Sequence, residues 1–127
     1  MRNLSITLII AFFMFSSTSF TEWIYTGKTK AATYYVNFES IKKVEGYHYY
    51  WDLIDYLRPT PGGTFSSKTY RMLDCKLLRS KILSDINYKE PMGAGVGSPY
   101  NVPDENWTYP SPDSILLSIS KIVCNYN

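Results

Sequence analysis

The sequence lacks most of the groups that catalytic or metal chemistry needs, because its 127 residues include one histidine and two cysteines. Thirteen lysines and arginines nearly balance eleven aspartates and glutamates, so no excess of charge indicates nucleic acid or an anionic membrane as a partner. His48 has no second histidine with which to bind a metal, and it is the single candidate base for a catalytic triad. We therefore expect no metal, no cofactor and no nucleic-acid ligand.

Long hydrophobic runs are also missing. The longest spans residues 4–15 and is shorter than the roughly 20 residues that a helix needs to cross a bilayer. Arg2 precedes this run and small residues follow it, which is typical of a secretory signal peptide. We expect a signal peptide at residues 1–19 and one mature domain at residues 20–127 without a transmembrane segment; a retained N-terminal anchor is the alternative. The mature protein would be periplasmic, on the outer cell surface or secreted.

The two cysteines, Cys75 and Cys124, are expected to form a disulfide bond, since exported proteins are oxidised. The bond would close a loop of about 49 residues, and the chain-entropy model gives it a stabilisation of about 4 kcal/mol. Two free or metal-binding thiols are the alternative, although no CxxC spacing accompanies them.

Aromatic residues are abundant, with twelve Tyr, six Phe and three Trp. We predict strands at residues 22–26, 33–37, 47–57, 65–74 and 75–86, and a polar connection at residues 40–46. The apolar residues of the stretch 73–86 also have near-helical spacing, so periodicity leaves a helix open there. Residues 88–110 are rich in proline and glycine and are predicted to be irregular.

Three alternating glycines, Gly93, Gly95 and Gly97, look at first like part of a phosphate-binding loop. Such a loop needs a helix directly after the glycines, and Pro99 and Pro103 prevent one. We therefore expect a connection in which Gly93 and Gly95 approach the sheet closely or adopt positive φ.

One helix is clearly predicted, at the C-terminus. Ser111 is the expected N-cap and Pro112 the first helical residue, and apolar residues follow at helical spacing. Cys124 lies off the apolar face at 100° per residue, so we expect the helix to loosen before it.

The predicted strand 47–57 is apolar or aromatic on both faces. Alternation places two sets of side chains on opposite faces, the first being Tyr47, Tyr49, Trp51, Leu53 and Leu57 and the second Tyr50, Ile54 and Tyr56. One helix can cover only one face. The other face must be covered by loops, by a second subunit or by a partner.

Exposed tyrosines in an exported protein favour contact with another molecule. The candidate partner-binding residues are the aromatic Tyr47, Tyr49, Tyr50, Trp51 and Tyr56 and the basic Lys76, Arg79 and Lys81. For the basic cluster, a solvated strand face is the alternative. Asp52, Asp55 and Asp74 are candidates for the paired carboxylates of a glycosidase, but solvated carboxylates are the simpler interpretation, so we expect no enzyme.

The order of several short motifs resembles the bacterial surface-adhesin protein E family over essentially the whole mature chain. The motifs are Trp23, Tyr34-Tyr35-Val36, Ser40-Ile41, Trp51, Asp55-Tyr56, Ser66-Ser67-Lys68, Asp74-Cys75, Met92-Gly93 with Gly95, Trp107, Pro112, Ser114 and Cys124. The resemblance implies an α+β fold, a single antiparallel β-sheet of about six strands with one C-terminal helix packed on one face and tied to it by a disulfide between Cys75 and Cys124. It also favours strands over a helix in residues 73–86.

The resemblance further implies a role in adhesion, since the family takes its name from an outer-membrane adhesin that binds host proteins and can dimerise. Our first hypothesis is a non-enzymatic exported module that binds a protein or glycan outside the cell, such as a host matrix or surface macromolecule. The second is a periplasmic structural or stress-related homodimer that buries its aromatic face. The third is a hydrolase that uses Asp52 or Asp55.

Overall fold

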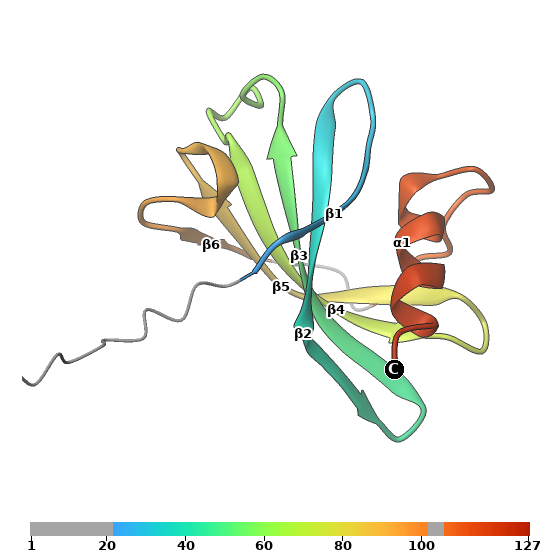
Figure 1. The fold of residues 1–127 in the computed structure, drawn as a ribbon. Coiled ribbons are helices and arrows are strands. Elements are labelled where there is room, and N and C mark those ends of the chain that lie inside the picture. The colour runs from blue at the N-terminus through green and yellow to red at the C-terminus, as the bar shows by residue number, and fades with distance from the viewer. Residues whose placement is uncertain (1–21, 102–105) are drawn as a thin grey trace, which may run out of the picture.

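Six β-strands lie in the sheet in the order in which they follow one another along the chain, each antiparallel to its neighbours (Figure 1). The computed structural model describes residues 22–101 and 106–127, and the predicted signal peptide lies outside them. The elements are β1 (Ile24–Lys28), β2 (Ala32–Val44), β3 (Tyr47–Tyr56), β4 (Ser66–Asp74), β5 (Arg79–Tyr88), η1 (Pro91–Gly93), β6 (Ser98–Tyr100) and α1 (Ile115–Cys124). The predicted α+β fold, with a six-stranded antiparallel sheet and a C-terminal helix, is confirmed.

Strand β2 is longer than predicted, because the polar stretch after Asn37 continues as a strand beyond a β-bulge. Ser40 Oγ spans the bulge by donating to the carbonyl of Asn37 at 2.6 Å and accepting from the amide of Trp51 at 3.0 Å. Glu45 and Gly46 then form a two-residue hairpin loop with φ values of 50° and 85°, as a type I′ turn requires. The predicted polar connection is therefore wrong, apart from this turn.

The segment after β4 forms a turn and a strand, which confirms the strand interpretation over the helix. Asp74 Oδ1 accepts hydrogen bonds from the amides of Lys76 and Leu77 at 3.0 and 3.3 Å, and these bonds stabilise the turn. Strand β5 consequently begins at Arg79 and not at Cys75. The short strand β6 pairs with β5 inside the segment that was predicted to be irregular.

Helix α1 starts later than predicted and runs through Cys124. Ser114 is the N-cap, and its Oγ accepts a hydrogen bond from the amide three residues on, at 3.2 Å. Asp113 has a φ of 62°, which lies outside the helical region, so Ser111 belongs to a turn before the helix. The expectation that the helix loosens before Cys124 is also wrong. The helix instead continues to Cys124, which lies one helical turn after the buried Ser120.

Helix α1 packs on one face of the sheet and closes the hydrophobic core. The fully buried core side chains come from β2, β3, β4 and α1, and they are Val36, Tyr50, Leu73, Ile119 and Val123. The predicted disulfide between Cys75 and Cys124 is present, with Cα atoms 5.7 Å apart, and joins the β4–β5 turn to the last turn of α1. Tyr50 was a candidate partner-binding residue, but its place in this core leaves it no exposed surface for a partner.

A buried ion pair lies on the same face of the sheet as this core. The side chains of Asp52 and Arg71 are 2% and 11% exposed, and Arg71 Nε donates to Asp52 Oδ2. Burial raises the pKa of Asp52, while the charge and hydrogen bond of Arg71 oppose that rise. Arg71 is therefore the main support of the carboxylate, with a smaller contribution from Thr69 and an opposing one from Asp85.

The glycine-rich stretch after β5 passes close to the opposite face of the sheet. Gly93 has a φ of 67°, and a Cβ added there would lie 2.5 Å from Lys68 Cε and 3.4 Å from Leu53 Cδ1. Gly95 has a φ of 81°. The expectations of positive φ and close approach are therefore confirmed. Figure 1 shows η1 and β6 on one side of the molecule and α1 on the other.

A substitution at Gly93 tests this close approach. Gly93→Ala should reduce the free energy of unfolding by about 2 kcal/mol, because a Cβ strains the positive φ and displaces Lys68. Gly62→Ala is the matched control, since a Cβ there meets nothing within 4 Å. Urea unfolding measures both. Equal stability of the two variants would contradict the described path of this stretch.

A second pair of variants tests the buried ion pair. Arg71→Met should cost about 3 kcal/mol of unfolding free energy, because it leaves the Asp52 carboxylate buried and unpaired. The double variant Arg71→Met with Asp52→Leu should recover most of that loss. The cost of the single variant should shrink from about pH 7 to about pH 4, since a protonated Asp52 needs no counter-charge. A cost that is independent of pH and of Asp52 would be the opposite result.

Candidate binding face

The face of the sheet opposite α1 carries a set of neighbouring aromatic side chains, which we call the aromatic face. The register of β2, β3 and β4 brings alternate residues into rows on it, and one row contains Asn37, Trp51 and Tyr70. The rings of the aromatic face are Trp23, Tyr25, Tyr35, Tyr47, Tyr49, Trp51, Tyr70, Tyr88 and Trp107. All three tryptophans of the sequence therefore lie on this face.

Neighbouring rings on the aromatic face pack against one another. Trp51 stacks on Tyr70 with ring centroids 5.0 Å apart, and the ring of Tyr49 lies 6.2 Å from that of Tyr70 in a tilted arrangement. Tyr47 stacks on Trp107 at 5.9 Å. These five rings are half-buried. Their mutual packing fixes the rings while part of each remains accessible to a partner.

Two cations hold Trp107 at one end of the aromatic face. Arg79 Cζ and Lys81 Nζ lie 4.3 and 4.6 Å from the centre of its ring. Arg79 Nε also pairs with Asp74 at 3.0 Å, and Arg79 donates to Tyr109 Oη at 3.2 Å. Desolvation alone would raise the pKa of Asp74, but hydrogen bonds from Arg79 and two backbone amides outweigh it and lower the pKa. Arg79 is therefore part of the scaffold of this end.

A groove of about 410 Å³, which we call the tryptophan groove, opens in the aromatic face away from Trp107. Its lining combines aromatic, aliphatic and polar side chains, and consists of Trp23, Asn37, Trp51, Lys68, Ile86 and Tyr88. Lys68 Nζ lies 4.9 Å from the centre of the Tyr88 ring and 5.9 Å from that of Trp23. The groove therefore combines apolar walls with a cation.

The chain covers part of this side of the sheet itself. Ser66 Oγ donates to a carbonyl at the start of η1 at 2.6 Å and accepts from the amide of Gly93 at 2.8 Å. The amide of Met92 donates to Asp55 Oδ1 at 2.9 Å. These bonds fasten η1 over the fully buried Leu53, next to the tryptophan groove. Loop cover of the second face, one of the three predicted alternatives, is therefore present but partial.

The predicted partner-binding residues divide into two groups. Those on the aromatic face or at its border are Tyr47, Tyr49, Trp51, Arg79 and Lys81.

The second group lies elsewhere. Tyr50 is in the core, Tyr56 is on the helix side of β3, and Lys76 is exposed in the β4–β5 turn.

The sequence patterns did not indicate nine members of the aromatic face and the groove, namely Trp23, Tyr25, Tyr35, Asn37, Lys68, Tyr70, Ile86, Tyr88 and Trp107. Lys68 and Tyr70 share a face of the predicted strand 65–74 by simple alternation. Their nearness to Trp51 depends on the pairing of β3 with β4, for which the local pattern carries no signal.

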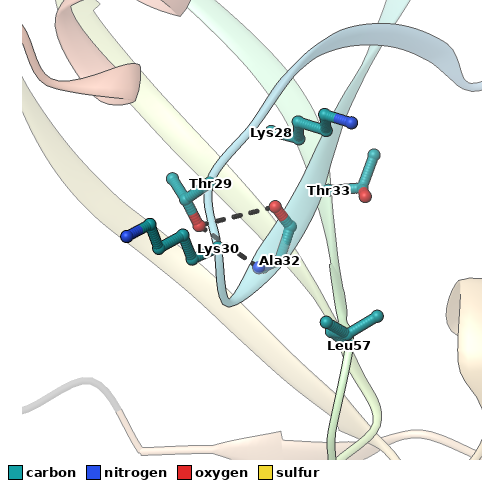
Figure 2. Close-up of a pocket in the computed structure, with 6 residues that line it drawn as sticks. All are labelled: Lys28, Thr29, Lys30, Ala32, Thr33 and Leu57. Carbon is teal, nitrogen blue, oxygen red and sulfur yellow. Dashed lines mark hydrogen bonds between the residues drawn. The ribbon is translucent and has the colours of Figure 1, made fainter.

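A larger hollow, of about 680 Å³, lies at the β1–β2 turn (Figure 2). Thr29 Oγ1 closes that turn with hydrogen bonds to the backbone of Ala32 at 3.2 and 3.5 Å. The side chains of Lys28 and Lys30 extend in opposite directions, and Leu57 lies below the turn (Figure 2). Since the two charges do not converge, this hollow is a weaker candidate than the tryptophan groove.

The two carboxylates of the hydrolase hypothesis do not face each other. Asp52 is buried beside Arg71 on the helix side of β3, whereas Asp55 lies on the opposite face, where it binds the amide of Met92. Residues 22–101 and 106–127 contain no group of three or more His, Cys, Asp or Glu side chains that could hold a metal ion. In the same parts of the chain, no helix is long and apolar enough to span a membrane.

Some of the solved structures with this fold come from Haemophilus influenzae. Crystal form II of its protein E is 20% identical, with a TM-score of 0.60 over 80% of this chain and 93% of that chain. The protein E structure from a non-typeable strain is 21% identical, with a TM-score of 0.59 over 80% of this chain and 76% of that chain. At these identities the likeness concerns the fold.

No curated protein is significantly similar in sequence to this chain. The model of one family, surface-adhesin protein E, matches residues 23–125 and thus spans nearly all of the described sheet, the disulfide and the helix. With its sequence match and its fold in agreement, the chain belongs to the surface-adhesin protein E family.

Proposed function

We propose that this protein is an exported, non-enzymatic module that binds an extracellular macromolecule, such as a host matrix or surface component, through the aromatic face. The observation that carries the proposal is the set of stacked, half-exposed rings around Trp51 and Tyr70. Tryptophan and tyrosine dominate the energetic centres of protein interfaces, because they offer large and rigid contact area. Membership of an adhesin family supports the same role.

The packing of the rings favours tight binding for an entropic reason. A side chain that is immobilised on binding costs about 0.5–1.5 kcal/mol. Trp51 is already fixed by Tyr70, and Trp107 by Tyr47 and by the cations Arg79 and Lys81. A partner would therefore meet a surface that is ordered before it arrives.

The disulfide bond supports the proposed export of the protein. The disulfide between Cys75 and Cys124 requires an oxidising compartment, such as the periplasm or the cell exterior. The signal peptide predicted at residues 1–19 would deliver the chain there. We place the mature protein in the periplasm, on the outer surface or outside the cell.

The central test removes the paired rings of the aromatic face. The double variant Trp51→Ala with Tyr70→Ala should bind at least 30-fold more weakly to immobilised basement-membrane matrix, because truncating an interface hot spot typically costs about 2 kcal/mol or more. Leu57→Ala is the matched control, since Leu57 is 77% exposed and lies just beyond the end of β3, in the hollow at the β1–β2 turn. Surface plasmon resonance gives the affinities, and circular dichroism checks the fold. Equal binding of both variants would refute the proposal.

A homodimer that buries the aromatic face is the competing account. Sedimentation of the wild type and of the Trp51→Ala, Tyr70→Ala variant distinguishes the two. A monomeric wild type, or a dimer that the double variant leaves intact, supports the proposal. A dimer that dissociates only in the double variant shows instead that a second copy occupies this face.

A further inference from the structure

The tryptophan groove combines features that a sugar-binding site needs, and we propose that it binds a carboxylate-bearing sugar of an extracellular glycan. This inference rests on the proposed function and names the ligand class for one part of the aromatic face. The groove, at about 410 Å³, lies within the range of about 300–1,000 Å³ that small-molecule sites occupy. It is therefore large enough for a sugar unit at the end of a chain or within it.

Lys68 provides a positioned charge in the groove. Its stem is held under the backbone of Gly93, where a Cβ would come within 2.5 Å of Lys68 Cε. Its ammonium group lies over the rings of Tyr88 and Trp23. The two salt bridges among the described residues involve Arg71 and Arg79, so Lys68 has no carboxylate partner there. An anionic ligand would supply that partner.

The walls of the groove suit the apolar faces of a pyranose ring. Trp23 and Trp51 both line it, and Trp51 is held in place by stacking on Tyr70. Asn37 adds a polar group, because its Oδ1 accepts from the amide of Glu39 at 3.1 Å and its Nδ2 is left to donate to a hydroxyl group. Aromatic rings for the C–H faces and an amide for the hydroxyl groups together match a sugar.

The polar groups of the groove also argue against other ligands. A lipid chain would remove Lys68 and Asn37 from water without giving them hydrogen-bond partners. Burying unpaired polar groups in this way costs free energy. A neutral sugar would satisfy Asn37 and leave the ammonium group uncompensated. A carboxylate on the sugar would accept a hydrogen bond from that ammonium group. Because both groups are charged, this hydrogen bond is stronger than one between neutral groups.

Two kinds of sugar supply this chemistry, and titration of the oxidised protein distinguishes them. Sialyllactose presents a sialic acid, a hyaluronan tetrasaccharide presents a hexuronate, and lactose is the neutral reference. Isothermal titration calorimetry should show that at least one acidic sugar binds tenfold or more tightly than lactose. The better of the two identifies the source of the carboxylate. Acidic sugars that bind no better than lactose would overturn the inference.

Paired lysine variants place the carboxylate. Lys68→Met keeps the stem of the side chain and removes its charge, so it should reduce the affinity for the acidic sugar to that for lactose. Lys121→Met is the matched control, because Lys121 is exposed on α1, on the other side of the sheet from the groove. Acidic binding that survives Lys68→Met, or that Lys121→Met removes equally, would show that the carboxylate lies elsewhere.

A further comparison separates this inference from the proposed function. Matrix binding that is lost in the Trp51→Ala, Tyr70→Ala variant but unaffected by Lys68→Met and by excess acidic sugar overturns the sugar assignment and leaves the aromatic face as the interface. A glutamate-rich peptide that binds as tightly as the acidic sugar would also overturn it, since the peptide lacks pyranose faces.

Discussion

The disulfide between Cys75 and Cys124 fixes which face of the sheet the single helix covers, and the two faces acquire their different characters from that choice. It anchors the last turn of α1 beside the β4–β5 turn, so that Ile119 and Val123 pack onto Val36, Tyr50 and Leu73. A helix of ten residues cannot also reach the other side. The aromatic face must therefore be stabilised by its own side chains and by the loop that carries η1.

The rings of the aromatic face are partly exposed and are nevertheless held in fixed positions. The rings pack on each other, and Lys68 lies over the ring of Tyr88. The backbone of Gly93 packs against the aliphatic part of the Lys68 side chain. Gly93 is therefore structurally required, since a residue with a Cβ could not pass so close to Lys68. The close approach of Gly93 to Lys68 therefore influences both the path of this stretch and the shape of the tryptophan groove, which Lys68 lines.

Local patterns predicted much of this fold, and long-range pairing accounts for what they missed. Alternation along the strand separates Tyr49 and Trp51 from Tyr50, apolar spacing predicts the C-terminal helix, and the two cysteines of an exported chain predict the disulfide. The family resemblance adds the single sheet of about six strands with the helix on one face. The sequence does not show which of the two faces the helix covers. Nor does it place Lys68 and Tyr70 beside Trp51, because that contact depends on the register of β3 and β4. The prediction of Ser111 as the N-cap was wrong because Asp113 adopts a positive φ, which is incompatible with a helix that begins before it.

The three tryptophans report directly on whether partners bind to the aromatic face, because all three lie there. Fluorine NMR of protein labelled with 5-fluorotryptophan resolves one signal for each ring. On addition of an acidic sugar, the signals of Trp23 and Trp51 should shift, and that of Trp107 should shift less. Binding that calorimetry detects while all three signals stay unchanged would show that the sugar binds outside the aromatic face.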